Sequence, residues 1–239
     1  MNTFENWIRH TPIANRGLYN EEIPENSLAA IKQAMDKNYG VCLDVRALAD
    51  NSIVVFADST LGRMTNTDGF VRHLSVRDLD GLFLGQSHEK IPTLAEVLEF
   101  VDGKVPIIIN IRSLDTTRFE KYVWKTVQDY KGEYAIASAN PFTLEWFKIH
   151  APKVKRGQIS SFYKGSPLPF KTRSDYKHMR LNATVSEPNF IMYKADNLPN
   201  RIVKKFKDLP LLAYHVNSDA LVERCRKCAD NLVFENVEL

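Results

Sequence analysis

Three arginines and one aspartate in this sequence stand where apolar, strand-like runs end or nearly end. Arg16 follows the run PIAN, Asp44 and Arg46 lie in GVCLDVRAL, and Arg112 lies in VPIIINIRS. A guanidinium group is always charged and presents a planar fork of donors that matches a phosphate. Arg16, Arg46 and Arg112 therefore predict an anion site that needs no metal. For Arg16 a structural salt bridge with Glu25 is an open alternative.

Candidate acids, bases and nucleophiles are scarce near the same runs. His215, close to the end of PLLAYHV, is the best candidate base, but if Tyr214 faces the site, alternation turns His215 away from it. Tyr214 is then a candidate for lining the ligand site. Asp58 either contacts a ligand or accepts hydrogen bonds that shape its loop. Cys42 is either a nucleophile or a small interior residue, and the lack of a neighbouring histidine in the sequence favours the second.

The elements that position these residues alternate along the whole chain. Several strand-like runs are apolar on both faces, as expected of parallel strands buried between two layers. The runs cover 12–17, 40–48, 52–58, 105–113, 133–139, 153–160, 189–196, 210–216 and 231–237. Helix-like patterns lie between them, at 27–38, 93–103, 116–132, 142–150 and 220–229.

One connection breaks the alternation. The segment ADN that joins 40–48 to 52–58 is too short for a parallel crossover, so these two runs must form an antiparallel hairpin. Removing the return strand leaves eight strands with crossover-length connections. This count predicts a single α/β domain over 1–239, a (β/α)₈ TIM barrel with a short β-hairpin insertion after its second strand. In that architecture the site lies at the C-terminal ends of the strands.

The bulk composition excludes several function classes. A net charge of +3 over 239 residues, with KKFK at 204–207 as the one basic cluster, argues against nucleic acid as a partner. No apolar run reaches the ~18 residues of a transmembrane helix, and the first residues have no signal-peptide pattern. We therefore expect a cytoplasmic protein. Cys225 and Cys228 form one CxxC without a second ligand pair, which disfavours a metal or redox role.

Ordered motifs along almost the whole chain resemble the glycerophosphodiester phosphodiesterase family. They begin with IANRG, PENS, LDV and VVFAD and continue through LGRMT and IPTL to RGQIS, EPNFIMYKADNLP, AYHVN and LVFEN. The resemblance implies a barrel of the phospholipase C-like phosphodiesterase type. It also implies a place in lipid metabolism and hydrolysis of a glycerophosphodiester to glycerol phosphate and an alcohol.

Such a family member uses two histidines as acid and base, three carboxylates that hold Ca²⁺ or Mg²⁺, and a lysine that faces the phosphate. This chain departs from that pattern. Asn15 and Ala57 stand at the two histidine positions, and Cys42 and Asn110 stand at two of the three carboxylate positions. Only Asp44 keeps its metal-ligand position. One carboxylate beside an amide, a thiol and arginines would hold a hard cation poorly.

The remaining residues favour binding over hydrolysis. Arg112 keeps the positive charge of the family lysine, while the missing histidines remove the usual proton transfer. We expect a pseudoenzyme that binds a phosphate-bearing glycerol or polyol ligand without a metal cofactor. One alternative is an active phosphodiesterase, or a phosphodiester-forming enzyme, with a rearranged site. Another is a structural partner subunit.

Overall fold

The computed structural model describes residues 3–112 and 119–239. It divides into two compact units, Ala14–Tyr134 and Met1–Ile13 with Ala135–Leu239, called here the 14–134 unit and the 135–239 unit. The chain has eight parallel strands, the strands of a closed (β/α)₈ barrel, and one further strand bonded outside the ring. The expected fold class is therefore confirmed, whereas a single domain over 1–239 stays a prediction.

The strands of the 14–134 unit carry most of the predicted site residues. β1 (Ile13–Asn15) pairs with β2 (Gly40–Ala47), and β2 pairs in parallel with β4 (Ile107–Ile111). β3 (Ile53–Val55) runs antiparallel to β2, with Val45 opposite Val55. The hairpin predicted from the short ADN connection is thus confirmed, and its ordered return strand is shorter than the predicted run.

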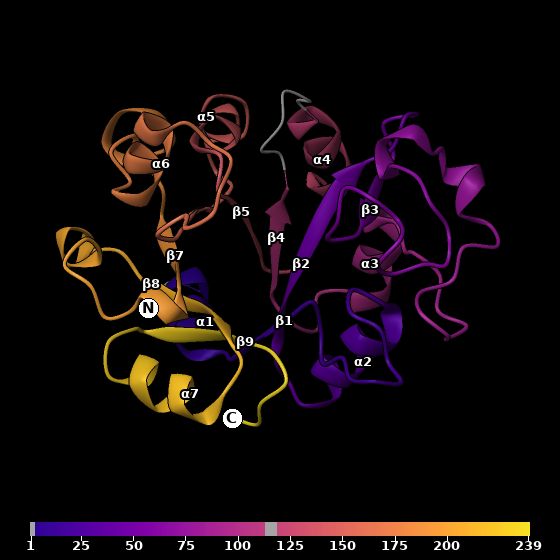
Figure 1. Ribbon diagram of the computed structural model, residues 1–239, viewed down its shortest axis with the longest axis horizontal. Helices are drawn as coiled ribbons and strands as arrows, with labels where there is room; N and C mark the ends of the chain where they lie inside the picture. Colours follow the sequence, from indigo (N-terminus) through magenta and orange to yellow (C-terminus); the bar gives the residue numbers. More distant parts are fainter. Residues whose placement is uncertain (1–2, 113–118) are drawn as a thin grey trace. The chain divides into compact units, whose positions relative to one another are not determined.

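Helices α2, α3 and α4 lie beside these strands, as Figure 1 shows. α2 (Leu28–Asp36) begins at Ser27, whose hydroxyl accepts a hydrogen bond from the Ala30 amide. α3 (Leu94–Val101) begins with a capping box between Thr93 and Glu96. Such caps satisfy amides that have no partner inside the helix. α4 (Glu120–Val127) is shorter than its predicted pattern of 116–132, of which 116–118 lie outside the described residues.

A small hydrophobic cluster supports the long segment between β3 and α3. This segment contains two 3₁₀ turns, η1 (Val71–His73) and η2 (Val76–Leu79), and an antiparallel bridge joins Thr60 to Phe70. Burial of apolar side chains holds this segment although it has little regular structure. The cluster consists of Leu48, Val54, Phe56, Leu61, Val71, Leu79, Leu84 and Ile91.

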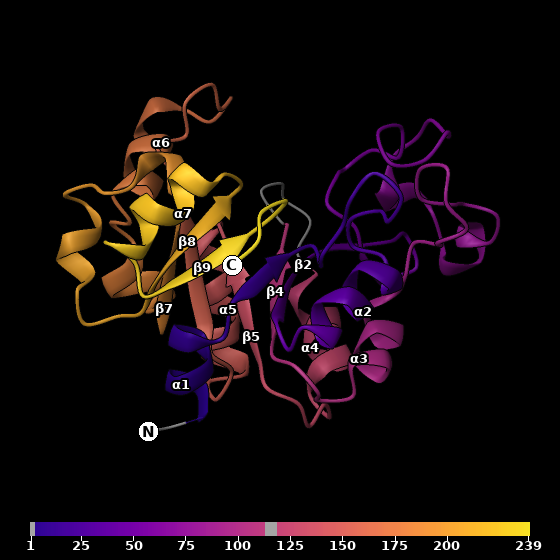
Figure 2. The same cartoon turned by 90° about the horizontal axis from the view of Figure 1, so that it is seen from below.

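The 135–239 unit contains five parallel strands in consecutive order, of which β7 to β9 are seen side by side in Figure 2. The strands are β5 (Tyr134–Ser138), β6 (Arg156–Ser160), β7 (Phe190–Lys194), β8 (Leu211–Val216) and β9 (Asn231–Phe234). The helices are α1 (Thr3–His10), α5 (Pro141–His150), α6 (Phe170–Lys177) and α7 (Asp219–Arg226). Further short turns are η3 (Asn182–Ser186), η4 (Ala195–Asn197) and η5 (Val203–Phe206). α1 and α6 were not among the predicted helices.

Candidate functional site

The turn after β1 fixes the position of Arg16. Arg16 and Gly17 both have positive φ angles, +63° and +79°. A Cβ atom on Gly17 would lie 2.6 Å from the backbone of Ala30 in α2, so the close approach of this helix requires glycine. The Arg16 amide donates to the Cys42 carbonyl at 2.6 Å, and its carbonyl accepts from the Asn26 amide at 2.8 Å. The backbone thus holds the arginine from both sides.

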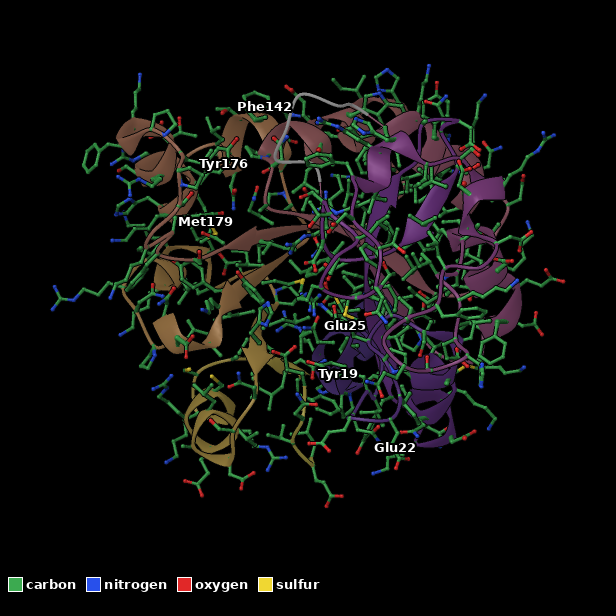
Figure 3. All side chains as sticks on the ribbon, turned by 45° about the vertical axis from the view of Figure 1, so that its right-hand side comes forward. Tyr19, Glu22, Glu25, Phe142, Tyr176 and Met179 are labelled. Carbon is green, nitrogen blue, oxygen red and sulfur yellow. The ribbon has the colours of Figure 1, made fainter. Side chains whose placement is uncertain are left out.

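The Arg16 side chain links two buried carboxylates. Its Nε donates to Oδ2 of Asp44 at 2.8 Å, and its Nη1 donates to both carboxylate oxygens of Glu25 at 3.0 Å. The side chains of Arg16, Asp44 and Glu25 are only 15%, 5% and 8% exposed. Glu25 is labelled in Figure 3 on the loop that leads to α2. Of the two roles considered for Arg16, the structure shows the salt bridge with Glu25.

The other oxygen of Asp44, Oδ1, also has donor groups nearby. Asn110 lies opposite Asp44 in the parallel β2–β4 pair and donates to its Oδ1 at 2.7 Å. Nη1 of Arg112 lies 3.8 Å from the same oxygen. Cys42, two residues before Asp44 in β2, is buried, with 2% exposure. Asp44 and Asn110, from two neighbouring strands, are therefore in direct contact.

Arg63 is the half-exposed member of a carboxylate network that also contains Arg16, Glu25 and Asp44. It donates to both oxygens of Glu25, at 3.2 and 2.6 Å, and to Oδ2 of Asp58. The hydrogen bond to Glu25 raises the pKa of the Arg63 guanidinium. Asp58 therefore accepts a hydrogen bond that holds the loop of Arg63 next to the end of the β2–β3 hairpin. The ligand contact predicted for Asp58 stays a prediction.

Arg46 and Arg112, both predicted ligand residues, line one pocket of about 150 Å³, called here the arginine pocket. Nε of Arg46 donates to the Ala57 carbonyl at 3.0 Å, and its Nη1 donates to the Arg112 carbonyl at 3.5 Å. The sequence interpretation missed Arg72, which lines the same pocket. Arg72 lies in the η1 turn, where no alternating strand pattern in the sequence could have pointed to it. The lining residues are Arg46, Ala47, Ser59, Phe70, Val71, Arg72, Arg112 and Phe119.

Asn15 and Ala57, which we predicted to stand at the histidine positions of the family pattern, lie in the 14–134 unit. Asn15 ends β1 and is 8% exposed, and Ala57 follows β3 and is 1% exposed. Neither side chain can give or take a proton near neutral pH. The Ala57 carbonyl instead accepts from Arg46, so this position supports a guanidinium group.

The other predicted candidates, Tyr214 and His215, belong to the 135–239 unit. An irregularity between Tyr214 and Val216 interrupts the β8–β9 ladder, and His215 has a φ of +59°. Simple alternation therefore does not apply here, and both Tyr214 and His215 are partly exposed. Nδ1 of His215 lies 2.9 Å from Oε1 of Glu235, which is 8% exposed. The sequence interpretation missed Glu235, since only the fold brings it to His215.

Tyr193 lies in β7 of the same unit. Its side chain is fully buried, and its hydroxyl donates to the Lys177 carbonyl at 3.2 Å. Burial raises the pKa of this phenol to about 12. Tyr193 is thus part of the interior of the 135–239 unit.

The residues present do not fit the divalent cation that the family pattern implies. Among residues 3–112 and 119–239, no group of three or more His, Cys, Asp or Glu side chains is placed to hold a metal ion. Both oxygens of Asp44 already accept hydrogen bonds, from Arg16 and from Asn110. A cation there would face Arg16 and Arg112 and would have one carboxylate instead of several oxygen ligands.

Within the described part of the chain, no helix has the length and apolar character needed to cross a bilayer. The expected cytoplasmic location stays a prediction.

Comparisons with known proteins agree with the motifs. The model of the glycerophosphoryl diester phosphodiesterase family matches residues 16–233. A glycerophosphodiester phosphodiesterase of Caldanaerobacter subterraneus is 34% identical over 159 residues, covering 62% of this chain and 65% of that protein. The matched part is therefore slightly less than two thirds of that relative's length.

Two solved structures show the same fold. A phosphodiesterase of Oleispira antarctica, in complex with its product sn-glycerol-3-phosphate, has a TM-score of 0.78 at 22% identity, covering 94% of this chain and 92% of that one. A glycerophosphodiester phosphodiesterase of Agrobacterium tumefaciens has a TM-score of 0.70 at 21% identity, covering 95% of both chains. With the family model matching most of its length, this chain belongs to the glycerophosphoryl diester phosphodiesterase family.

Proposed function

We propose that this protein binds a small phosphate-bearing ligand, a glycerol or polyol phosphate, without a metal ion and without hydrolysing a phosphodiester. The observation that carries the proposal is the arginine pocket. Arg46 and Arg112 line it together, and none of the described lining residues is acidic. Guanidinium groups can contact a phosphate in a bidentate manner and remain charged at all physiological pH values.

The loss of hydrolysis rests on the residues at the former acid and base positions. Asn15 and Ala57 cannot transfer protons, and such transfer contributes about 10²–10⁴-fold in rate. In addition, the negative charge of the retained Asp44 carboxylate is balanced by Arg16, and its other oxygen accepts a hydrogen bond from Asn110. The binding of a phosphate survives these changes, because it depends on the arginines.

A calcium titration tests the metal-free part of this proposal. We expect isothermal titration calorimetry to show no stoichiometric binding of Ca²⁺ or Mg²⁺ at millimolar concentration, because Arg16 and Asn110 occupy the oxygens of Asp44. A one-to-one calorimetric transition with either cation would contradict it.

A ligand titration in EDTA tests the binding itself. We expect saturable binding of glycerol 3-phosphate, weakened about 10–100-fold by Arg112→Gln, because a hydrogen bond to a charged group contributes about 1.5–3 kcal/mol. Arg77→Gln is the matched control, since Arg77 lies on η2 and is not among the lining residues. Absence of binding by the parent protein would overturn the proposal and favour a structural partner subunit.

A second candidate function is supported by the His215–Glu235 contact. A carboxylate only accepts hydrogen bonds, so in a neutral His215 ring the 2.9 Å contact with Glu235 requires the proton on Nδ1, and Nε2 is then the acceptor nitrogen. This is the arrangement of a general base held by a carboxylate, and it supports an active phosphodiesterase with a rearranged site. Turnover of glycerophosphocholine by the parent protein, abolished by His215→Gln, is the result that would select this function.

A further inference from the structure

We infer that residues 161–181, called here the docking segment, bind the surface of a bilayer that contains anionic lipid and bury Phe170 among its headgroups. This inference goes beyond the ligand proposed for the arginine pocket and does not depend on it. The docking segment directly follows β6 and contains α6. Figure 2 shows α6 projecting at one edge of the 135–239 unit.

The docking segment is strongly basic. Its lysine and arginine residues outnumber its one acidic residue, Asp175, by four, an excess larger than the net charge of +3 of the whole chain. Asp175 forms an ion pair with Arg180 at 3.0 Å. Lys164 and Lys171 are exposed, and neither takes part in an ion pair within residues 3–112 and 119–239. A surface of this charge attracts the anionic headgroups of a bilayer. The basic residues are Lys164, Lys171, Arg173, Lys177 and Arg180.

A large apolar side chain lies among these charges. Phe170, the first residue of α6, is 80% exposed, more than any other large apolar side chain in the described part of the chain. Pro167 and Pro169, just before it, are exposed as well. An exposed aromatic ring flanked by lysines is typical of protein surfaces that lie in a bilayer interface, where the ring is buried and the ammonium groups reach the headgroups.

The other end of α6 is attached to the strands. The Ser160 hydroxyl, at the end of β6, donates to the Tyr176 carbonyl at 2.9 Å. The Tyr193 hydroxyl, in β7, donates to the Lys177 carbonyl at 3.2 Å. Both acceptors lie at the C-terminal end of α6, and none of the residues of this helix is buried. The helix therefore presents Phe170 to the solvent from a fixed support, which lowers the ordering cost of docking.

The basic run KKFK at 204–207 provides a comparison within the same unit. Lys204 and Lys205 are exposed, but Phe206 is only partly exposed and the acidic Asp208 directly follows the run. This run has charge without an exposed aromatic ring. It is therefore the matched control for an effect of charge alone.

Sedimentation of the full chain with lipid vesicles tests the inference. We expect binding to vesicles of equimolar phosphatidylserine and phosphatidylcholine, and about 100-fold weaker binding to phosphatidylcholine alone, because each basic residue near an anionic surface contributes about fivefold. Salt at about 1 M should weaken the binding, since it shortens the screening length to about 3 Å. An excess of glycerol 3-phosphate should leave the binding unchanged, which separates the docking segment from the arginine pocket. Absence of binding to the phosphatidylserine vesicles would overturn this inference and leave the proposed function standing.

Charge reversal locates the binding surface. Lys164→Glu with Lys171→Glu should weaken binding to the phosphatidylserine vesicles at least about 25-fold, roughly fivefold for each lysine lost. Lys204→Glu with Lys205→Glu changes the net charge by the same amount and should have a much smaller effect. Equal weakening by the two double variants would show that binding follows net charge alone, which contradicts the inference.

Substitution of Phe170 distinguishes a bilayer from other anionic partners. Phe170→Ser should weaken vesicle binding about tenfold, whereas Ile149→Ser, which removes a 63% exposed side chain of α5 outside the docking segment, should not change it. Phe170→Trp should keep the affinity, and phosphatidylserine vesicles should shift the emission of the added indole to shorter wavelength and protect it from acrylamide. Unchanged binding by Phe170→Ser, or tighter binding of the parent protein to an RNA homopolymer than to the vesicles, would overturn the inference.

Discussion

Replacement of Arg16 by glutamine is expected to lower the free energy of unfolding by about 3–5 kcal/mol, the range for breaking a buried ion pair by removal of one partner. The reason is the burial of its two partners. Asp44 and Glu25 have side chains that are 5% and 8% exposed, and both receive hydrogen bonds from this one guanidinium. Without Arg16, Asp44 keeps Asn110 and the more distant Arg112, and Glu25 keeps Arg63.

A more exposed arginine that also contacts two carboxylates provides the control. Arg9 also contacts two carboxylates, Glu5 at 3.2 Å and Asp230 at 2.6 Å, but the three side chains are 28%, 42% and 36% exposed. Arg9→Gln should therefore cost about 1 kcal/mol or less, as exposed ion pairs do. Urea unfolding of parent and variants, followed by circular dichroism, gives both values. Equal losses in the two variants would show that the carboxylate network contributes no more than a surface ion pair.

The sequence predicted the strands well because their pattern is set by burial on both faces. The three-residue ADN connection alone established the antiparallel hairpin, and its register is now seen between β2 and β3. α6 could not be predicted in this way, since none of its residues is buried and it has no apolar stripe. For α1 the signal was present, as Phe4, Trp7 and Ile8 are its buried residues at helical spacing.

The candidate site was predictable where strands determine it and unpredictable where loops do. Arg46 and Arg112 were predicted because they lie near the ends of strand-like runs, and they line one pocket in the structure. Arg72 lines the same pocket only because residues 59–73 fold back on themselves. The hydrophobic cluster that contains Val71 and the bridge between Thr60 and Phe70 hold this fold. Contacts of this kind depend on tertiary packing, which has no period in the sequence.

Restoring the family residues at four positions is expected to produce metal-dependent hydrolysis that the parent protein lacks. The variant combines Asn15→His, Cys42→Glu, Ala57→His and Asn110→Glu. Asn110 now donates to Asp44 at 2.7 Å, so its replacement by glutamate turns a donor into a second carboxylate on the same face. Glutamate at Cys42 adds a third carboxylate from the same strand as Asp44.

Clustered carboxylates repel one another without a cation, which determines how this variant should respond to calcium. We expect the metal-free variant to be less stable than the parent and to gain about 2.7 kcal/mol when free Ca²⁺ reaches a hundred times its dissociation constant. The parent should show no such gain, because its single Asp44 carboxylate is compensated by Arg16 and Asn110. Thermal unfolding with and without calcium measures this difference.

A double variant separates metal binding from proton transfer. Cys42→Glu with Asn110→Glu restores the carboxylates and leaves Asn15 and Ala57 unchanged, so it should be stabilised by calcium while hydrolysing glycerophosphocholine about 10²–10⁴-fold more slowly than the fourfold variant. That factor is the contribution expected from the two histidines. If the parent hydrolyses glycerophosphocholine as fast as the fourfold variant, proton transfer in this chain depends on neither position 15 nor position 57. His215, held by Glu235, is then the candidate for the proton-transfer group.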